Sequence, residues 1–133
     1  MSKKNFLNYW NNMYSKTDVF GTGATILAKN AKDILQNTDV KTILEVGCGQ
    51  GRDSIYFSTL GYNVDAFDVS QNAIDHVTKI KHEMNLSKLT PFVHDAKISL
   101  SKTNKMYDFI YSNLALQFFE INELDLIFKN ISD

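Results

Sequence analysis

The hydrophobic pattern of the chain changes its period at about residue 40. Before that point, apolar residues recur at helical spacing in two segments. The first segment runs from Asn5 to Tyr14 and the second from Ala24 to Gln36, with a Phe-Gly-Thr-Gly turn at residues 20–23 between them. We expect the buried face of the second helix to consist of Leu27, Ala31, Ile34 and Leu35.

After residue 40, short apolar runs alternate with helical patterns. The runs predict strands over residues 42–46, 63–68, 90–93 and 107–111. Between them, helices are predicted over residues 54–60, with Gly61 as a C-cap, and from Ser70 onward; a last helix is predicted over about residues 121–131. The inner face of the helix that Ser70 begins would carry Ile74, Val77, Ile80 and Met84. Alternating strands and helices predict an α/β fold with a doubly wound, mostly parallel sheet.

Composition narrows the class of protein. The chain has 133 residues, which is enough for one domain, and 44% of them are hydrophobic. Its 14 basic and 15 acidic residues nearly cancel, so we expect no nucleic-acid partner. One cysteine cannot form an internal disulfide, and no segment approaches the ~20 apolar residues of a membrane span. We expect a cytoplasmic protein without a membrane partner.

The stretch ILEVGCGQGRD, residues 43–53, places three glycines between a predicted strand and a predicted helix. Gly47, Gly49 and Gly51 permit unusual backbone angles and close approach of the backbone to a ligand. Arg52 stands where a G-x-G-x-x-G dinucleotide fingerprint has its third glycine. A tight turn alone would also explain the glycines. The preceding strand, the following helix and an acidic residue downstream favour ligand binding.

Acidic residues follow the second and third predicted strands. Asp68 lies 21 residues after Gly47, where a carboxylate accepts both hydroxyls of a ribose; the alternative is a cap for the helix at Ser70. Asp95 can accept from an adenine amine beside the small Ala96, or be a solvated loop residue. Because no second His or Cys lies at a ligand-like spacing, we expect no metal site.

Two further segments offer residues to the site. Asn113 and Gln117, after the fourth strand, can hydrogen-bond a substrate or the amino-acid part of a cofactor, or cap the local backbone. Aromatic residues near the start form either a lid that excludes water or an amphipathic helix packed on the sheet, and both can hold. These aromatic residues are Tyr9, Trp10, Tyr14 and Phe20.

The ordered set E-V-G-C-G-Q-G, F-D-V-S, H-D-A and Y-D-F-I-Y-S-N-L-A-L-Q resembles class I S-adenosylmethionine-dependent methyltransferases over Thr42 to about Phe119. Within that superfamily, YWNNMY and GCGQGRDSIYF resemble the small-molecule group that includes tellurite-resistance and thiopurine methyltransferases. SNLALQFF is also similar to the malonyl-carrier-protein methyltransferase of biotin synthesis. The resemblance implies a Rossmann-like sheet of strand order 3-2-1-4, with N-terminal helices.

The resemblance also implies a cofactor, S-adenosylmethionine, and its product S-adenosylhomocysteine. Glu45 would organise the ammonium group, Asp68 the ribose hydroxyls and Val69 the adenine ring, while Cys48 would only fill the loop. The other cofactor-binding positions would be Gly47, Gly49, Gly51, Asp95, Ala96 and Asn113. Methyl transfer from a sulfonium is a direct displacement, for which many such enzymes need no dedicated base, and the sequence identifies no catalytic residue.

The resemblance leaves the extent and activity of the chain open. Residues 1–40 would form a helical lid and residues 41–133 a truncated core of one domain, because the family's sheet normally has seven strands. A fragment of a longer protein is expected; a second chain or a minimal domain are the alternatives. The open edge at residues 107–111 would favour homodimers. A small-molecule methyltransferase leads, ahead of a non-catalytic binding module and a nucleotide-dependent oxidoreductase.

Overall fold

The computed structural model of the chain describes residue 8, residues 23–98 and residues 106–113. The predicted helices at residues 5–14 and 121–131 lie outside the described residues. So do five predicted site residues, namely Tyr9, Trp10, Tyr14, Phe20 and Gln117.

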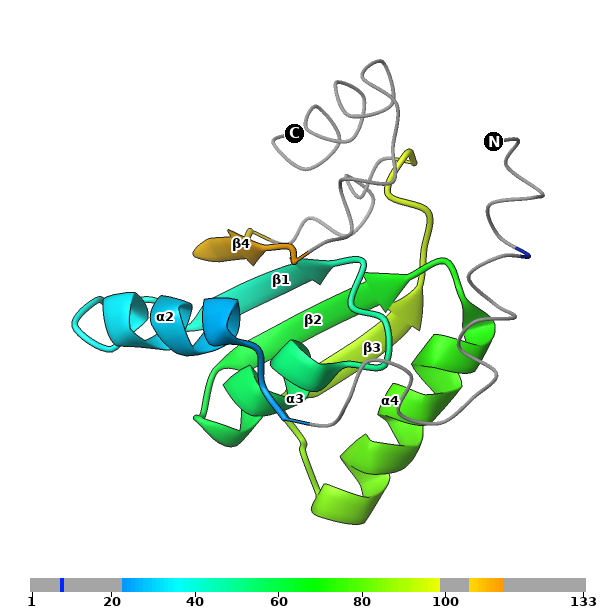
Figure 1. Cartoon of the computed structure of the whole chain (residues 1–133), viewed down its shortest axis with the longest axis horizontal. Coiled ribbons are helices and arrows are strands. Elements are labelled where there is room, and N and C mark those ends of the chain that lie inside the picture. Colours follow the sequence, from blue (N-terminus) through cyan, green and yellow to red (C-terminus); the bar gives the residue numbers. More distant parts are fainter. Residues whose placement is uncertain (1–7, 9–22, 99–105, 114–133) are drawn as a thin grey trace.

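The described strands form one parallel sheet in the order β3-β2-β1-β4 (Figure 1). The strands are β1 (Thr42–Val46), β2 (Asn63–Asp68), β3 (Leu89–Val93) and β4 (Phe109–Tyr111). The helices are α2 (Ile26–Leu35), α3 (Arg52–Thr59) and α4 (Gln71–Met84). The predicted α/β class, Rossmann-like topology and strand order are confirmed.

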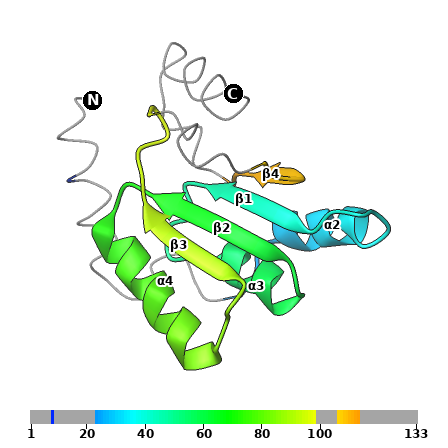
Figure 2. The same cartoon turned by 180° about the vertical axis from the view of Figure 1, so that it is seen from behind.

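The three described helices lie on one face of the sheet, and Figure 2 shows the opposite face from behind. In the register, Glu45 of β1 pairs with Ala66 of β2 on one side and with Tyr111 of β4 on the other. Paired residues of neighbouring strands project to the same face. Glu45 and Tyr111 therefore lie side by side beneath α3.

Each face of the sheet has its own apolar cluster. On the helix face, Phe57 of α3 is fully buried, and its ring meets that of Tyr111 edge-on at 5.1 Å between centroids. On the other face, the buried cluster consists of Leu44, Val46, Phe67 and Ala96. The main core thus attaches α3, the helix that follows the glycine loop, directly to the centre of the sheet.

Local signals in the sequence account for the helix ends. The Ser70 hydroxyl accepts from the Ala73 amide at 3.1 Å, so Ser70 is the N-cap of α4 as predicted. Gly61, just after α3, has a φ of 100°, in the left-handed region that suits a helix end. The Thr25 hydroxyl, which the sequence did not single out, caps α2 by accepting from Ala28 N at 3.2 Å.

The expected buried face of α2 was partly wrong. Leu27 is 46% exposed and Ile34 is 71% exposed, whereas Ala28 joins Ala31 and Leu35 in the interior. Small alanines bring the helix backbone close to its neighbours, and this rotates the larger side chains outward. The helix also begins at Ile26 and not at Ala24, because Thr25 is its cap.

Two predictions further along the chain, the burial of Met84 and the start of the fourth strand, also differ from the structure. Met84 is 49% exposed, because it forms the last turn of α4 next to the exposed cap Asn85. Strand β4 begins at Phe109 and not at Tyr107. The residue before it, Asp108, uses its carboxyl group to accept from the amides of Lys41 and Thr42, at 2.9 and 3.2 Å.

Candidate functional site

The loop between β1 and α3 has the backbone shape that the glycines predicted. Gly47, Gly49 and Gly51 have φ values of 71°, 55° and 82°, all in the region that other residues rarely adopt. A Cβ atom on Gly51 would lie 2.7 Å from Cγ2 of Val77 in α4. The loop is therefore left-handed at three positions and packed closely against a neighbouring helix.

Asp68, at the carboxyl end of β2, fastens this loop. Its Oδ2 accepts from the Gly49 amide at 2.9 Å, and its Oδ1 accepts from the Ser70 amide at 3.0 Å. Burial raises the pKa of this carboxyl group, and the backbone donors partly offset the effect. Ser70 caps α4 with its own hydroxyl, so Asp68 is not needed as that helix's cap.

Glu45, next to the loop at the end of β1, is 3% exposed. The Ser54 hydroxyl of α3 donates a hydrogen bond to Oε1 of Glu45. The pKa of Glu45 is raised well above its ordinary value, first by burial and then by the neighbouring carboxyl groups of Asp53 and Asp68. A cation brought to this position would relieve both effects.

Cys48 lies inside the loop and is 8% exposed. Its thiol donates to the Gly49 carbonyl at 3.6 Å. Burial raises the pKa of this thiol, and the nearby Asp68 and Glu45 raise it further. The thiolate is disfavoured here, which agrees with the interpretation of Cys48 as a loop filler and not a nucleophile.

A third buried acidic residue, Asp53, accepts hydrogen bonds from donors in two other segments. Its Oδ1 accepts from the Thr25 amide at 3.0 Å. Its Oδ2 accepts from the hydroxyls of Thr25 at 2.8 Å and Tyr111 at 2.7 Å. We call Thr25, Asp53, Tyr111 and Asn113 the Asp53 cluster. It joins the start of α2 and the end of β4 to the first turn of α3.

The predicted site residue Asn113 belongs to this cluster. Its side-chain amide donates to the Thr25 hydroxyl at 3.1 Å and to Oδ2 of Asp53 at 3.4 Å. The preceding Ser112 donates to the Val46 carbonyl at 3.0 Å, which ties the end of β4 to the end of β1. The structure therefore places Asn113 at the expected end of the sheet, with its amide group turned toward Asp53 and Thr25.

The predicted adenine-side residues follow β2 and β3. Asp95 accepts from the Lys97 amide at 2.9 Å in a tight turn after β3, and Ala96 is buried in the cluster on the far face of the sheet. Val69 is half-buried between Asp68 and Ser70. The carboxyl ends of β1, β2 and β3 thus carry the predicted residues in the expected order.

The sequence missed the roles of four residues, namely Thr25, Asp53, Ser54 and Tyr111. The signal that identifies them comes from the structure, in which α3 buries Asp53, Ser54 and Ser58 together with Phe57. Polar residues on the inner stripe of a short helix require buried partners. The strand register then identifies two of these partners, since Glu45 and Tyr111 are neighbours across β1 and β4.

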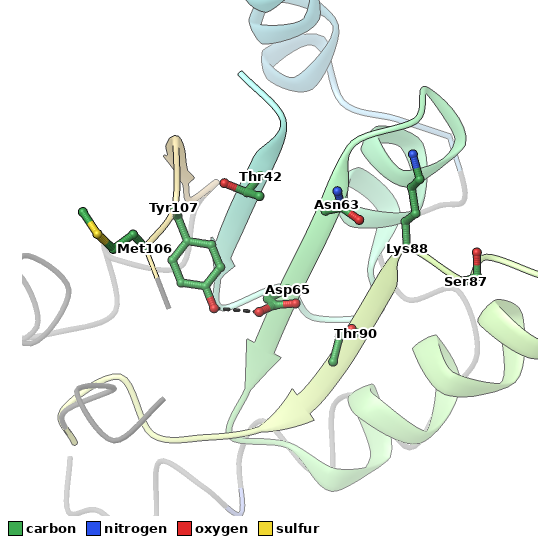
Figure 3. A pocket seen from close by; sticks show the side chains of 8 residues that line it. All are labelled: Thr42, Asn63, Asp65, Ser87, Lys88, Thr90, Met106 and Tyr107. Carbon is green, nitrogen blue, oxygen red and sulfur yellow. Dashed lines mark hydrogen bonds between the residues drawn. The ribbon is translucent and has the colours of Figure 1, made fainter. Parts of the chain in front are cut away.

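A separate hollow of about 360 Å³ lies at the other end of the strands (Figure 3). Figure 3 shows the Tyr107 hydroxyl pointing to Asp65, to which it donates at 2.6 Å. The hollow is lined by Thr42, Asn63, Asp65, Ser87, Lys88, Thr90, Met106 and Tyr107. It includes none of the residues at the glycine loop.

Within the described part of the chain, no group of three or more His, Cys, Asp or Glu residues is arranged to hold a metal ion. None of the described helices has the length and apolar character that crossing a membrane requires.

Residues 3–133 match the family model described as "Tellurite resistance protein TehB". The chain belongs to this family. A curated relative, the probable S-adenosyl-L-methionine-dependent methyltransferase TehB of Haemophilus influenzae (strain 10810), is 34% identical over 91 residues, which are 68% of this chain and 31% of the relative. The prediction from the sequence, that the chain belongs to a family of S-adenosylmethionine-dependent methyltransferases, is confirmed.

Solved structures agree with this assignment. The crystal structure of TehB from Haemophilus influenzae matches at a TM-score of 0.67 and 28% identity, over 93% of this TehB-family chain and 40% of the other. The glycopeptide N-methyltransferase MtfA, in complex with S-adenosyl-L-methionine, matches at a TM-score of 0.68 and 17% identity, over 84% and 46% of the two chains. At that identity the likeness concerns the fold. The chain spans about a third of its curated relatives' length.

Proposed function

We propose that this chain binds S-adenosylmethionine and transfers its methyl group to a small-molecule acceptor. The observation that carries the proposal is the close grouping of the glycine loop, Glu45 and Asp68 at the carboxyl ends of β1 and β2. Ligands bind in α/β sheets at this end of the strands. A bare loop between two buried carboxyl groups suits a ligand with a hydroxylated ring and a cationic end.

The residues present fit the parts of this cofactor. The Asp68 carboxyl group accepts from the amides of Gly49 and Ser70, and the Val69 amide also favours its charged form. Because a carboxylate has about four acceptor sites, it keeps acceptor capacity for a ribose hydroxyl. Glu45 is a buried carboxyl group that an ammonium would favour in its charged form. Val69, Asp95 and Ala96 would meet the adenine, and the backbone of Gly47, Gly49 and Gly51 would border the chain between the two ends.

The chain's own contribution to the reaction would be binding and alignment. When bound, the cofactor supplies an electrophilic methyl group on a sulfonium. Glu45 and Asp68 would hold the two ends of the molecule and so fix the direction in which the methyl group faces. Direct displacement then needs an aligned nucleophile and little water, and it needs no basic side chain.

The residues that we expect on the acceptor side lie outside the described part of the chain. We propose that Tyr9, Trp10, Tyr14 and Phe20 exclude water there and that Gln117 contacts the acceptor. Because the family is named for tellurite resistance, tellurite belongs in any panel of acceptors. The proposed compartment is the cytoplasm and the proposed oligomer is a homodimer through the edge of β4, which cell fractionation and analytical ultracentrifugation test.

Calorimetry separates the proposal from its alternatives. The chain should bind S-adenosylhomocysteine and not NAD, and binding of NAD alone would overturn the proposal. Asp68→Ala should weaken the binding of S-adenosylhomocysteine by ~1–3 kcal/mol if the carboxyl group holds the ribose. Transfer of a labelled methyl group to a panel of thiols, amines, carboxylates and tellurite distinguishes an enzyme from a binding module. Binding without transfer to any of them would favour the module.

A further inference from the structure

Two consecutive residues in the first turn of α3 contact two neighbouring residues of the sheet. Ser54 donates to the carboxyl group of Glu45, and Asp53 accepts from the hydroxyl of Tyr111 at 2.7 Å. Glu45 and Tyr111 are register partners in β1 and β4. One helix turn therefore holds both members of a cross-strand pair, one on each strand.

The Asp53 side chain is held in a single orientation. It is 4% exposed, and both of its oxygens accept hydrogen bonds. The donors come from Thr25 at the start of α2 and from Tyr111 and Asn113 at the end of β4. Because buried hydrogen-bond networks support one another, loss of the carboxyl group would release all of these contacts together.

The Asp53 cluster and Asp68 lie on opposite sides of β1. The strand order β3-β2-β1-β4 places Asp68 on the β2 side and Tyr111 on the β4 side. Glu45, on β1, is between them. A ligand whose ribose meets Asp68 and whose ammonium meets Glu45 would therefore direct its amino-acid end toward β4.

We propose that Asp53 is a positioning residue for the amino-acid end of the bound cofactor. The inference rests on the proposed function. Asp53 acts through Tyr111 and α3, which keep β4 and the Ser54–Glu45 hydrogen bond in place beside one another. It does not act on the adenosine end, which belongs to Asp68.

The far face of the sheet offers a matched control. The Tyr107 hydroxyl donates to Asp65 at 2.6 Å, and this pair also connects the start of β4 to β2 (Figure 3). It is the same kind of hydrogen bond between the same residue types. It lies at the hollow on the opposite face, away from Glu45, so Tyr107→Phe removes an equivalent contact without touching the proposed site.

The experiment compares two ligands by calorimetry, S-adenosylhomocysteine and 5′-methylthioadenosine. The second keeps the adenosine and the sulfur but lacks the amino-acid arm. Tyr111→Phe should raise the Kd of S-adenosylhomocysteine by about tenfold, as expected for one lost hydrogen bond of a charged group, and Asp53→Ala, which removes several such bonds, by at least as much. The Kd of 5′-methylthioadenosine should stay within about twofold, and Tyr107→Phe should change neither affinity.

A double variant tests whether Asp53 acts through Glu45. If it does, the double variant Asp53→Ala with Glu45→Gln should raise the Kd of S-adenosylhomocysteine by less than the product of the two single fold increases. Equal weakening of both ligands, or an unchanged S-adenosylhomocysteine affinity, would overturn the inference. If Asp53→Ala does not fold, Tyr111→Phe decides, since it keeps the ring that packs on Phe57. Failure of the wild-type chain to bind S-adenosylhomocysteine would instead overturn the proposed function.

Discussion

At the scale of single residues, Glu45 has opposite consequences for stability and for binding. Its pKa in the folded chain is raised well above the ordinary 4.5, chiefly by burial. Above that ordinary value the unfolded chain loses the proton and the folded chain keeps it, so stability falls as pH rises toward the folded pKa. Glu45→Gln cannot ionise and should gain stability relative to the wild type as pH increases from about 5 to 8.

Urea unfolding of both proteins at several pH values measures this difference. Glu45→Gln should also weaken the binding of S-adenosylhomocysteine, because the glutamine amide cannot neutralise the ligand's ammonium group. Glu83→Gln is the control. Glu83 is 56% exposed, and its 4.0 Å ion pair with Lys79 on the same helix should contribute little to stability. A stability difference between Glu45→Gln and wild type that is the same at pH 5 and pH 8 would contradict the pKa direction of Glu45.

At the scale of elements, the sequence predicted regular structure better than side-chain contacts. Periodicity and glycine placement were enough for β1 and β2, because these signals are local. They also predicted α3, although the helix spans Arg52–Thr59 and not residues 54–60. The Asp53 cluster was not predictable in this way. Its donors, Thr25 and Tyr111, are 28 and 58 residues from Asp53, and the packing of α2 and the register of β4 bring them together. The exposure of Ile34 likewise depends on how closely the alanines of α2 pack.

The glycine loop provides a prediction at this scale. Gly51→Ala should destabilise the fold by ~1–3 kcal/mol, because a left-handed φ of 82° is unfavourable for alanine. Crowding adds to that cost, since the new Cβ would meet Val77 at 2.7 Å. Thermal unfolding measures the effect.

Two other glycines separate strain from crowding. Gly61 has a φ of 100° but open space around it, so Gly61→Ala should show the cost of the backbone strain without crowding. Gly23 has neither, and Gly23→Ala should be close to neutral. Adding Val77→Ala to Gly51→Ala should recover the crowding part. If Gly51→Ala and Gly23→Ala had equal effects, the tight packing of the loop against α4 would be refuted.

At the scale of the whole molecule, the core and the proposed site share the helix α3. Phe57 is fully buried in the helix-face cluster, where its ring meets Tyr111 at 5.1 Å and Tyr62 at 6.4 Å. Four residues earlier, Asp53 holds the same Tyr111 by its hydroxyl. Packing and hydrogen bonding therefore fix the same helix against the same strand, so stability and binding should be linked.

Phe57→Ala should lower the free energy of unfolding by ~3–5 kcal/mol, because it leaves a cavity between α3 and the sheet. Phe57→Leu fills more of that space and should have a smaller effect. A ligand that binds only the folded state adds ~2.7 kcal/mol at a hundredfold excess over its Kd. S-adenosylhomocysteine at a hundredfold excess over the wild-type Kd should therefore stabilise the wild type by that amount and Phe57→Ala by less, because the looser α3 weakens binding. Equal stabilisation of both proteins would contradict the link between packing of α3 and binding.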